Sequence, residues 1–255
     1  MSNELITSYN SICTVCGSTE TFEFFGGSPR ESFNCPKCKS SLRYREQAKS
    51  IVSLYGNNRY ASFSELVLDP NFKRLNIFEP GVTGPFRKYF NDFDNYHQSF
   101  YWEDLQLGKS RDGIQNQDLM NLTYEDDTFD LIITSDIFEH VRKPFLGFEE
   151  IYRVLQPGGI HVFSIPAHHP MRKKTHFRVD TSGPEDIHID PPNYHGDGKG
   201  GKSLVYVDYG LDFINHLNDI GFNTYLEFVD VDDRYSGVNV SFYSVKNSKP
   251  THIKN

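Results

Sequence analysis

The sequence lacks two features that would assign it to a membrane or to a nucleic-acid surface. None of its apolar runs approaches the roughly 18 residues that a membrane-spanning helix needs, and it has no excess of basic residues. Of its 255 residues, 26 are Lys or Arg and 34 are Asp or Glu, so the formal net charge is −8. A chain this acidic is a poor general binder of nucleic acid or anionic lipid.

The N-terminal sequence MSNELITSYN also lacks a basic region followed by an apolar stretch, so we expect no secretory signal. Apolar residues make up 37% of the chain and the mean hydropathy is −0.54, values typical of a soluble globular protein. The length suits one full-sized domain with a small appendage. We therefore expect a cytoplasmic protein without a membrane partner, and the oligomeric state stays open.

Cysteine is scarce, and all of it lies near the N-terminus. The four residues form two C-x-x-C pairs that are separated by 18 residues: Cys13, Cys16, Cys35 and Cys38. Each pair directs two sulfurs toward one point, so two pairs complete a tetrahedron and predict a zinc ribbon. Two disulfides are the alternative, which the expected cytoplasmic location disfavours. Four thiolates leave no open position on the metal, so we expect the zinc to be structural.

The first sixty residues have little net charge. They contain seven basic and five acidic side chains, and Zn²⁺ with four thiolates would add a charge of −2. This balance argues against a ribbon that grips RNA. Lys39, Arg43 and Arg45 could form a local basic patch, but a solvated helix face is the simpler expectation for them.

The remaining chain alternates between strand and helix patterns, which predicts an α/β fold with a mainly parallel sheet. Expected strands are 74–79, 95–100, 113–117, 129–135 and 159–165, and expected helices are 42–56, 62–68, 144–155 and 208–220. The end differs, because two β-rich runs at 222–231 and 238–246 flank a Ser236-Gly237 turn and predict a hairpin with an antiparallel last strand. We divide the chain into a ribbon (1–41), a helical linker (42–70) and a main domain (71–255) with a long loop at 166–203.

A turn after the first strand of the main domain suits a ligand that lies against the backbone. It reads Glu79-Pro80-Gly81-Val82-Thr83-Gly84 and is expected between a strand and a helix. Glycine permits close approach of a ligand, and a helix N-terminus offers free N–H groups. The full G-x-G-x-x-G pattern is missing, and Ser99 stands where a dinucleotide-binding domain has a ribose-binding acid. A nicotinamide-dependent dehydrogenase is therefore not expected.

The segment 118–166 carries the most specific signal. Asp118-Leu119, TFDLIITSDIFEHV (128–141) and EEIYRVLQPGG (149–159) closely resemble class I S-adenosylmethionine-dependent methyltransferases. The resemblance extends over about 74–247, and the attached ribbon resembles a bacterial subgroup of these enzymes. It implies a Rossmann-like sheet of seven strands with the last strand antiparallel, and S-adenosyl-L-methionine bound at the carboxyl ends of the strands.

The resemblance also implies which residues contact the cofactor. The glycine turn would surround its amino-acid part, Ser99 or Glu103 would lie near the ribose, Asp118 and Leu119 would meet the adenine, and Asp136 would lie near the methyl group. This sequence departs from the family pattern at Val82-Thr83, where a middle glycine is missing, and at Ser99. The implied cofactor-binding set is Glu79, Gly81, Gly84, Ser99, Asp118, Leu119 and Asp136.

Histidines are the candidates for proton removal, because an acceptor hydroxyl keeps its proton near pH 7. Five of the ten histidines lie within 168–195, where the family usually places substrate, and His140 follows the fourth strand. We nominate His195, His140 and His188 as catalytic. Two alternatives stay open: Mg²⁺ or Mn²⁺ held by Asp190, His195 and Asp197, and a hydrated loop whose polar groups satisfy one another.

These observations predict a methyltransferase that acts on a hydroxyl of a small molecule or sugar. The first alternative is an RNA methyltransferase with a zinc ribbon, against which the net charge of −8 argues. The second alternative is a non-catalytic scaffold that binds the cofactor, which the irregular glycine turn keeps possible.

Overall fold

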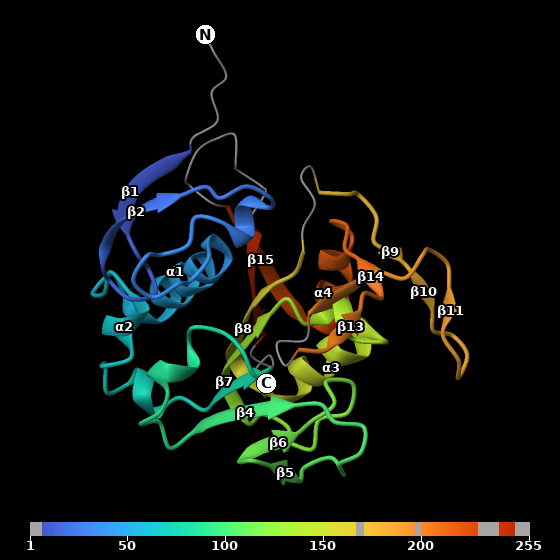
Figure 1. Cartoon of the computed structure of the whole chain (residues 1–255). Helices are drawn as coiled ribbons and strands as arrows, with labels where there is room; N and C mark the ends of the chain where they lie inside the picture. The colour runs from blue at the N-terminus through green and yellow to red at the C-terminus, as the bar shows by residue number, and fades with distance from the viewer. Residues whose placement is uncertain (1–6, 167–170, 197–199, 229–239, 248–255) are drawn as a thin grey trace, which may run out of the picture.

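A computed structural model describes residues 7–166, 171–196, 200–228 and 240–247. Its centre is one mixed sheet of eight strands (Figure 1). Their spatial order is β15 (Phe222–Phe228), β16 (Val240–Lys246), β8 (Leu155–Ser164), β7 (Phe129–Ser135), β3 (Ile77–Pro80), β4 (Tyr96–Phe100), β6 (Ile114–Asn116) and β5 (Ser110–Arg111).

The direction of the strands confirms the expected methyltransferase sheet. The five strands from β8 to β6 run parallel, and β16 pairs antiparallel with both β8 and β15. The eighth strand is β5, a two-residue strand that pairs antiparallel with β6 at the edge and adds to the seven expected. The turn expected at Ser236-Gly237 lies outside the described residues.

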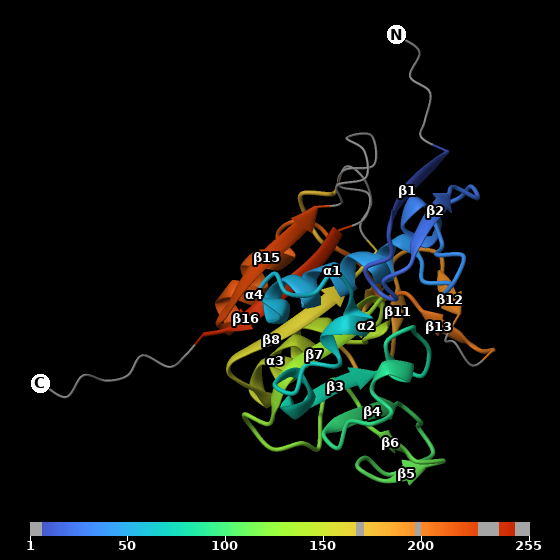
Figure 2. The same ribbon diagram turned by 90° about the vertical axis from the view of Figure 1, so that its left-hand side faces the viewer.

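Both faces of the sheet are buried, which explains the continuous apolar run in β7. Its side chains alternate: Leu131 and Ile133 pack on one face, and Ile132 packs on the other. α3 (Pro144–Val154) and α4 (Phe213–Ile220) cover the face of Ile132. α1 (Leu42–Gly56) covers the opposite face across β8 and β16 (Figure 2).

α1 is sandwiched between the sheet and the N-terminal hairpin of β1 (Ser8–Ile12) and β2 (Thr19–Glu23). Several of its polar side chains are therefore buried, Arg43 and Arg45 among them, and the expectation of a solvated face at these two residues was wrong. Arg45 donates hydrogen bonds to the carbonyl oxygen of Phe33 at 3.0 Å and to the hydroxyl of Tyr9 at 2.7 Å. Lys39 is exposed, as expected.

The ribbon and the sheet share one hydrophobic cluster. Cys13, Phe33 and Leu42 belong to the same set of buried residues as Ile51 and Ile133. Arg45 lies over the ring of Phe22, with 3.7 Å from its guanidinium carbon to the ring centroid, which fills the space between ribbon and helix. The ribbon is thus packed on the main domain.

The helix expected after the glycine turn does not form. Residues 85–94 contain only the 3₁₀ turn η3 (Arg87–Tyr89). Phe86, Phe90 and Phe93 are buried there, in a cluster with Phe63 from α2 (Phe63–Leu66) and with Phe72. Because α1 covers much of this face of the sheet, the segment contributes aromatic side chains to the core without becoming helical.

The long segment at 166–203 is ordered into short ribbons over its described parts. β10 (Val179–Asp180) pairs with β11 (Ile187–His188), β12 (Tyr194–Gly196) pairs with β13 (Lys202–Leu204), and β9 (His176–Phe177) pairs with β14 (Val207–Asp208). This arrangement returns His195 to the main domain and leaves His188 exposed. No helix among the described residues has both the length and the apolar character needed to cross a membrane.

Candidate functional site

The four cysteines come together as their spacing predicted. The Sγ atoms of Cys13 and Cys38 lie 3.6 Å apart and those of Cys16 and Cys35 lie 3.8 Å apart, with no disulfide among them. With Zn–S bonds of 2.3 Å, two sulfurs on a tetrahedron are about 3.8 Å apart. The arrangement therefore fits zinc, which would tie the two C-x-x-C turns together.

Each of the two turns closes in the same way. The N–H of Gly17 donates to the carbonyl oxygen of Cys13 at 2.8 Å, and the N–H of Lys39 donates to that of Cys35 at 2.8 Å. Both Gly17 and Lys39 have positive φ, +75° and +63°. Lys39 thus has a backbone role in the metal site in addition to its exposed charge.

A cavity of about 1060 Å³ opens at the carboxyl ends of β3, β4, β6 and β7. This is the edge at which open α/β sheets bind ligands. Eight of the predicted cofactor-binding and catalytic residues line it: Glu79, Gly81, Ser99, Asp118, Leu119, Asp136, His140 and His195. The structure thus gathers residues from most of the main domain into one place.

Two predicted residues do not line the cavity. Gly84 lies behind it, where a Cβ atom would be 3.5 Å from Glu79 Oε1 and 3.6 Å from the hydroxyl of Tyr44. His188 is exposed on β11. Its placement gives no support to a role in proton removal.

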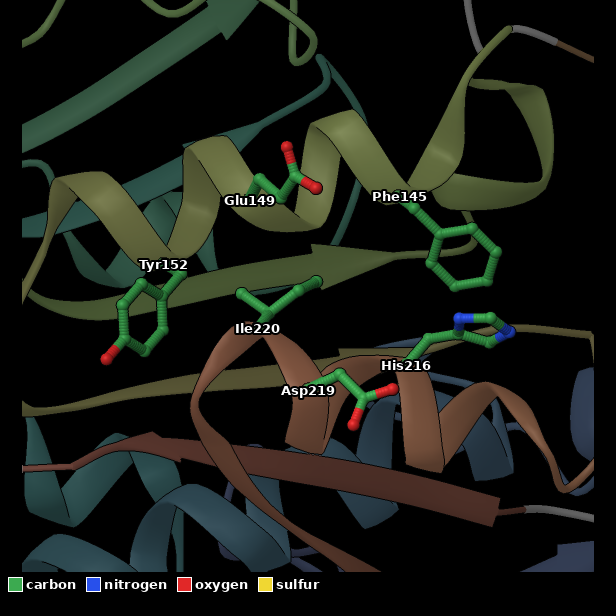
Figure 3. A pocket seen from close by; sticks show the side chains of 6 residues that line it. All are labelled: Phe145, Glu149, Tyr152, His216, Asp219 and Ile220. Atoms are coloured by element: carbon green, nitrogen blue, oxygen red, sulfur yellow. The ribbon is translucent and has the colours of Figure 1, made fainter.

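A smaller depression of about 480 Å³ lies between α3 and α4 (Figure 3). The ring of Phe145 packs against that of His216, with 4.4 Å between centroids, and Glu149 and Asp219 also line the depression. It contains none of the predicted site residues.

The glycine turn has the conformation for which glycine is needed. Gly81 has φ +98° and Gly84 has φ +131°. A Cβ at Gly81 would project to 3.5 Å from Ile137 Cδ1, at the wall of the cavity. The Gly81 N–H donates to the carbonyl oxygen of Ser99 at 2.8 Å, which holds the turn against β4. The turn is therefore open to a ligand at Gly81 even though no helix follows it.

Glu79 is a buried acid at the base of this turn. Its Oε2 accepts a hydrogen bond from the hydroxyl of Tyr96 at 2.7 Å. Burial raises the pKa of Glu79 to about 7, and the Tyr96 hydrogen bond and the charge of Arg87 oppose the rise only in part. Arg87 also donates to the carbonyl oxygen of Gly81.

The predicted ribose and adenine contacts lie along the next two strand ends. Ser99 is buried at the end of β4, and Glu103 also lines the cavity. Asp118 accepts a hydrogen bond from the N–H of Met120 at 2.8 Å, which fixes the turn that places Leu119 at the wall. The contacts of these residues with ribose and adenine stay predictions.

Asp136 has partners that the sequence did not indicate. Both its carboxylate oxygens accept from the guanidinium of Arg30, and its Oδ1 also accepts from the Ser164 hydroxyl at 2.8 Å. Arg43 Nε lies 3.4 Å away. Burial alone would raise the pKa of Asp136, but the charges of Arg30 and Arg43 outweigh burial and lower it to about 2.

The ribbon therefore supplies part of the cavity wall. Arg30 belongs to η1 (Pro29–Glu31), and Arg43 lies in the first turn of α1 with its Nε 2.7 Å from Glu31 Oε1. Arg30, Glu31 and Arg43 all line the cavity. The pairing of Arg30 with Asp136 has no sequence pattern, because 106 residues separate the two positions.

Glu139, His140 and His195 form a second polar group at the cavity. Glu139 Oε1 lies 3.6 Å from His140 Nε2 and 3.7 Å from His195 Nδ1. The two imidazoles are perpendicular, with centroids 5.0 Å apart. The sequence nominated both histidines, whereas Glu139 was passed over although it precedes His140 directly.

The cation site expected from Asp190, His195 and Asp197 is not assembled. Asp190 Oδ2 lies 2.8 Å from His176 Nε2 and 3.4 Å from Arg178 Nη1, so it is paired within the loop. Asp197 lies outside the described residues. His195 is instead directed toward Glu139.

Comparison with known proteins gives a family match over part of the chain. Residues 92–163 match the family model described as a methyltransferase domain. Over this segment, the match agrees with the resemblance to methyltransferases. No curated protein matches the chain.

Two solved structures are similar to this chain at low sequence identity. An S-adenosylmethionine-dependent methyltransferase from Mesorhizobium loti is 18% identical with a TM-score of 0.43, covering 67% of this chain and 90% of that one. One from Clostridium acetobutylicum is 15% identical with a TM-score of 0.45, covering 79% and 99%.

Proposed function

We propose that this protein transfers the methyl group of S-adenosylmethionine to a hydroxyl group of a small molecule or sugar. The observation that carries the proposal is that one cavity unites the predicted donor residues with the group formed by Glu139, His140 and His195. A reaction between two substrates requires both to be held in one space.

The strand ends form the donor half of the cavity. S-Adenosylmethionine, when bound, supplies an electrophilic methyl group on a positively charged sulfur. Gly81 leaves room for the amino-acid part, Ser99 and Glu103 lie where a ribose would bind, and Asp118 and Leu119 lie where adenine would bind. The open space at Gly81, which a Cβ would narrow, is the feature of this chain that fits the cofactor.

The acceptor half lies toward β12 and β13. His195 comes from β12 and is paired in register with Ser203, and both line the cavity together with Tyr206 and Arg142. Polar side chains of this kind suit a ligand with several hydroxyl groups. Bond formation between the acceptor oxygen and the methyl carbon requires that the hydroxyl lose its proton, and Glu139, His140 and His195 are the polar groups that support this step.

The four cysteines and the ribbon residues in the cavity wall support a structural role for the ribbon. Zinc on four cysteine sulfurs has no open position for a substrate. Arg30 and Glu31 of the ribbon contribute charge to the cavity, so we propose that the zinc holds these two residues in place. The acidic net charge again favours a small acceptor over RNA.

Calorimetry with S-adenosylhomocysteine tests the donor half. Wild type should bind one equivalent per chain, and Gly81→Val should weaken binding at least about tenfold, because a branched side chain at positive φ closes the cavity wall. Gly113→Val is the matched control, since Gly113 also has positive φ (+79°) but has free space around its Cβ position. Equal affinities of the two variants would remove the glycine turn from the site.

The acceptor class is tested by turnover with hydroxylated sugars and with RNA. His195→Ala should slow methyl transfer to the hydroxyl acceptor far more than it weakens S-adenosylhomocysteine binding. Binding of bulk RNA with a steep salt dependence, together with RNA methylation, would instead establish the RNA methyltransferase. Cofactor binding without transfer to any acceptor would support the scaffold.

A further inference from the structure

We propose that Glu139, His140 and His195 bind a divalent first-row transition-metal cation such as Mn²⁺ or Fe²⁺ at the acceptor end of the cavity. The proposal rests on the proposed function and refines it, because it assigns the three side chains as ligands. It also replaces the ligand set expected from the sequence, of which only His195 is kept.

The positions of the donor atoms carry the first step. One nitrogen from each imidazole and one carboxylate oxygen of Glu139 lie within 4.8 Å of one another, and Oε1 is nearly equidistant from the two nitrogens. With metal–ligand bonds of 2.1 Å, neighbouring ligand atoms are about 3.0–3.4 Å apart. The His195 side chain is 40% exposed, so it has room for the small movement that this requires.

Hydrogen bonding carries the second step. The Glu139 side chain is only 1% exposed, and neither of its oxygens has a hydrogen-bond partner within the described part of the chain. A buried carboxylate without a partner is unfavourable, and buried charges are ordinarily paired or bound to metal. Glu139 Oε1 lies 3.6 and 3.7 Å from the two imidazole nitrogens.

The tautomer of His140 carries the third step. Its Nδ1 lies 2.8 Å from the carbonyl oxygen of Leu204, which can only accept, so Nδ1 carries the proton. In the neutral imidazole, Nε2 then presents a lone pair toward Glu139. A metal cation between these two lone-pair groups would relieve their repulsion, as a proton would, and a carbonyl that fixes the far nitrogen is the usual arrangement around a metal-binding histidine.

The ligand types select the class of metal. Two imidazoles with one carboxylate favour first-row transition metals, whereas Mg²⁺ and Ca²⁺ prefer oxygen ligands throughout. Three protein ligands leave open positions, and His140 and His195 both line the cavity. An acceptor hydroxyl bound there would lose its proton to water more readily. Its oxygen then bonds to the methyl carbon, and the electron pair of the C–S bond returns to sulfur.

Mn²⁺ titration of the zinc-loaded full-length protein, followed by electron paramagnetic resonance of free Mn²⁺, tests the site. Wild type should bind one Mn²⁺ per chain, and Glu139→Gln and His195→Ala should each weaken binding at least about tenfold. His188→Ala is the matched control, because it removes an exposed histidine from a neighbouring ribbon of the same loop and should leave Mn²⁺ affinity unchanged. S-Adenosylhomocysteine calorimetry on each variant checks that the fold and donor half persist.

Absence of stoichiometric Mn²⁺ binding by the wild type, or equal affinity in Glu139→Gln, would overturn the cation site. So would methyl transfer at the full rate after chelation that removes Mn²⁺ and leaves zinc in the ribbon, and this result would leave the proposed function standing. Mn²⁺ binding that depends on Glu139, combined with no transfer to any hydroxyl acceptor, would support the cation site and overturn only the function.

Discussion

The two groups of candidate metal ligands in this protein differ in how the chain builds them. The four cysteines lie within 26 residues and are brought together by two local turns. Glu139 and His140 lie on η4 (Phe138–His140), whereas His195 arrives from β12, 55 residues further along the chain. The first group is enclosed by four sulfurs, and the second has three ligands and faces a cavity. The cysteine group thus follows from local sequence spacing, whereas the group of Glu139, His140 and His195 depends on how distant segments are arranged in the fold.

The largest expected effect is at the ribbon, where the loss of one cysteine tests whether the metal is needed for folding. Cys35→Ser removes a buried thiolate ligand, so we expect loss of zinc and of the cooperative thermal transition, because binding of a structural metal is coupled to folding. Elemental analysis and thermal unfolding measure both effects. Ser18→Ala, which removes a hydroxyl 3.1 Å from Cys16 Sγ, should keep one zinc. A stable, zinc-free Cys35→Ser protein would show that the ribbon packs without its metal.

The next largest effect is expected at the ion pair between Arg30 of the ribbon and Asp136 of the main domain. Arg30→Ala leaves the partly buried Asp136 (17% exposed) without its bidentate partner, and with Arg43 still 3.4 Å away we expect a loss of about 2–3 kcal/mol of unfolding free energy. Arg59→Ala is the control, since Arg59 is 53% exposed beside Asp69 and its loss should cost less than about 1 kcal/mol. Urea unfolding at neutral pH compares them. Similar losses in both variants would mean that the ribbon contact does not stabilise the cavity.

Glu79 in the cavity should make the unfolding free energy of the protein depend on pH. The pKa of Glu79 is about 7 in the folded protein against 4.5 when unfolded, so its contribution to stability is complete below pH 4.5 and is lost as pH rises through 7. Between pH 5 and 8 the wild type should lose roughly 2–3 kcal/mol relative to Glu79→Gln. Urea unfolding of both proteins at the two pH values measures this difference. Parallel pH profiles would argue against a proton on Glu79.

The smallest expected effect has the opposite sign to that of Cys35→Ser. Glu139→Gln replaces an unpartnered buried carboxylate by a neutral amide, so in metal-free buffer we expect the unfolding free energy to rise by about 1 kcal/mol. That corresponds to a Tm increase of about 2–4 °C, which calorimetry resolves. A lower Tm would show that the carboxylate already stabilises the fold without a cation.

Much of the fold could be predicted because its signals are local. The zinc turns follow from cysteine spacing, and the alternation of apolar runs with the helix at 144–155 predicts the parallel sheet. The helix expected after Gly84 failed because α1, from outside the methyltransferase motifs, covers that face of the sheet. The same arrangement buries Arg43 and Arg45, which charge alone had assigned to solvent.

The cavity residues at strand ends were easier to predict from the sequence than those that the long loop and the ribbon bring to the cavity. Gly81, Asp118 and Asp136 stand at strand ends, which sequence motifs mark. The register between β12 and β13 that directs His195 toward Glu139 has no local signature, and His188, only seven residues away, is turned outward. Arg30 could not be found from motifs because it belongs to the ribbon.

The contact from Arg30 to Asp136 bears on how the chain can be shortened or recombined. A protein that begins at residue 42 would retain every methyltransferase motif, yet Asp136 at the cavity would lose its bidentate partner Arg30 and keep only the more distant Arg43. Exchange of the ribbon for that of another protein would meet the same difficulty unless an arginine came with it. The first 41 residues lie outside the methyltransferase motifs, but they form part of the cavity wall.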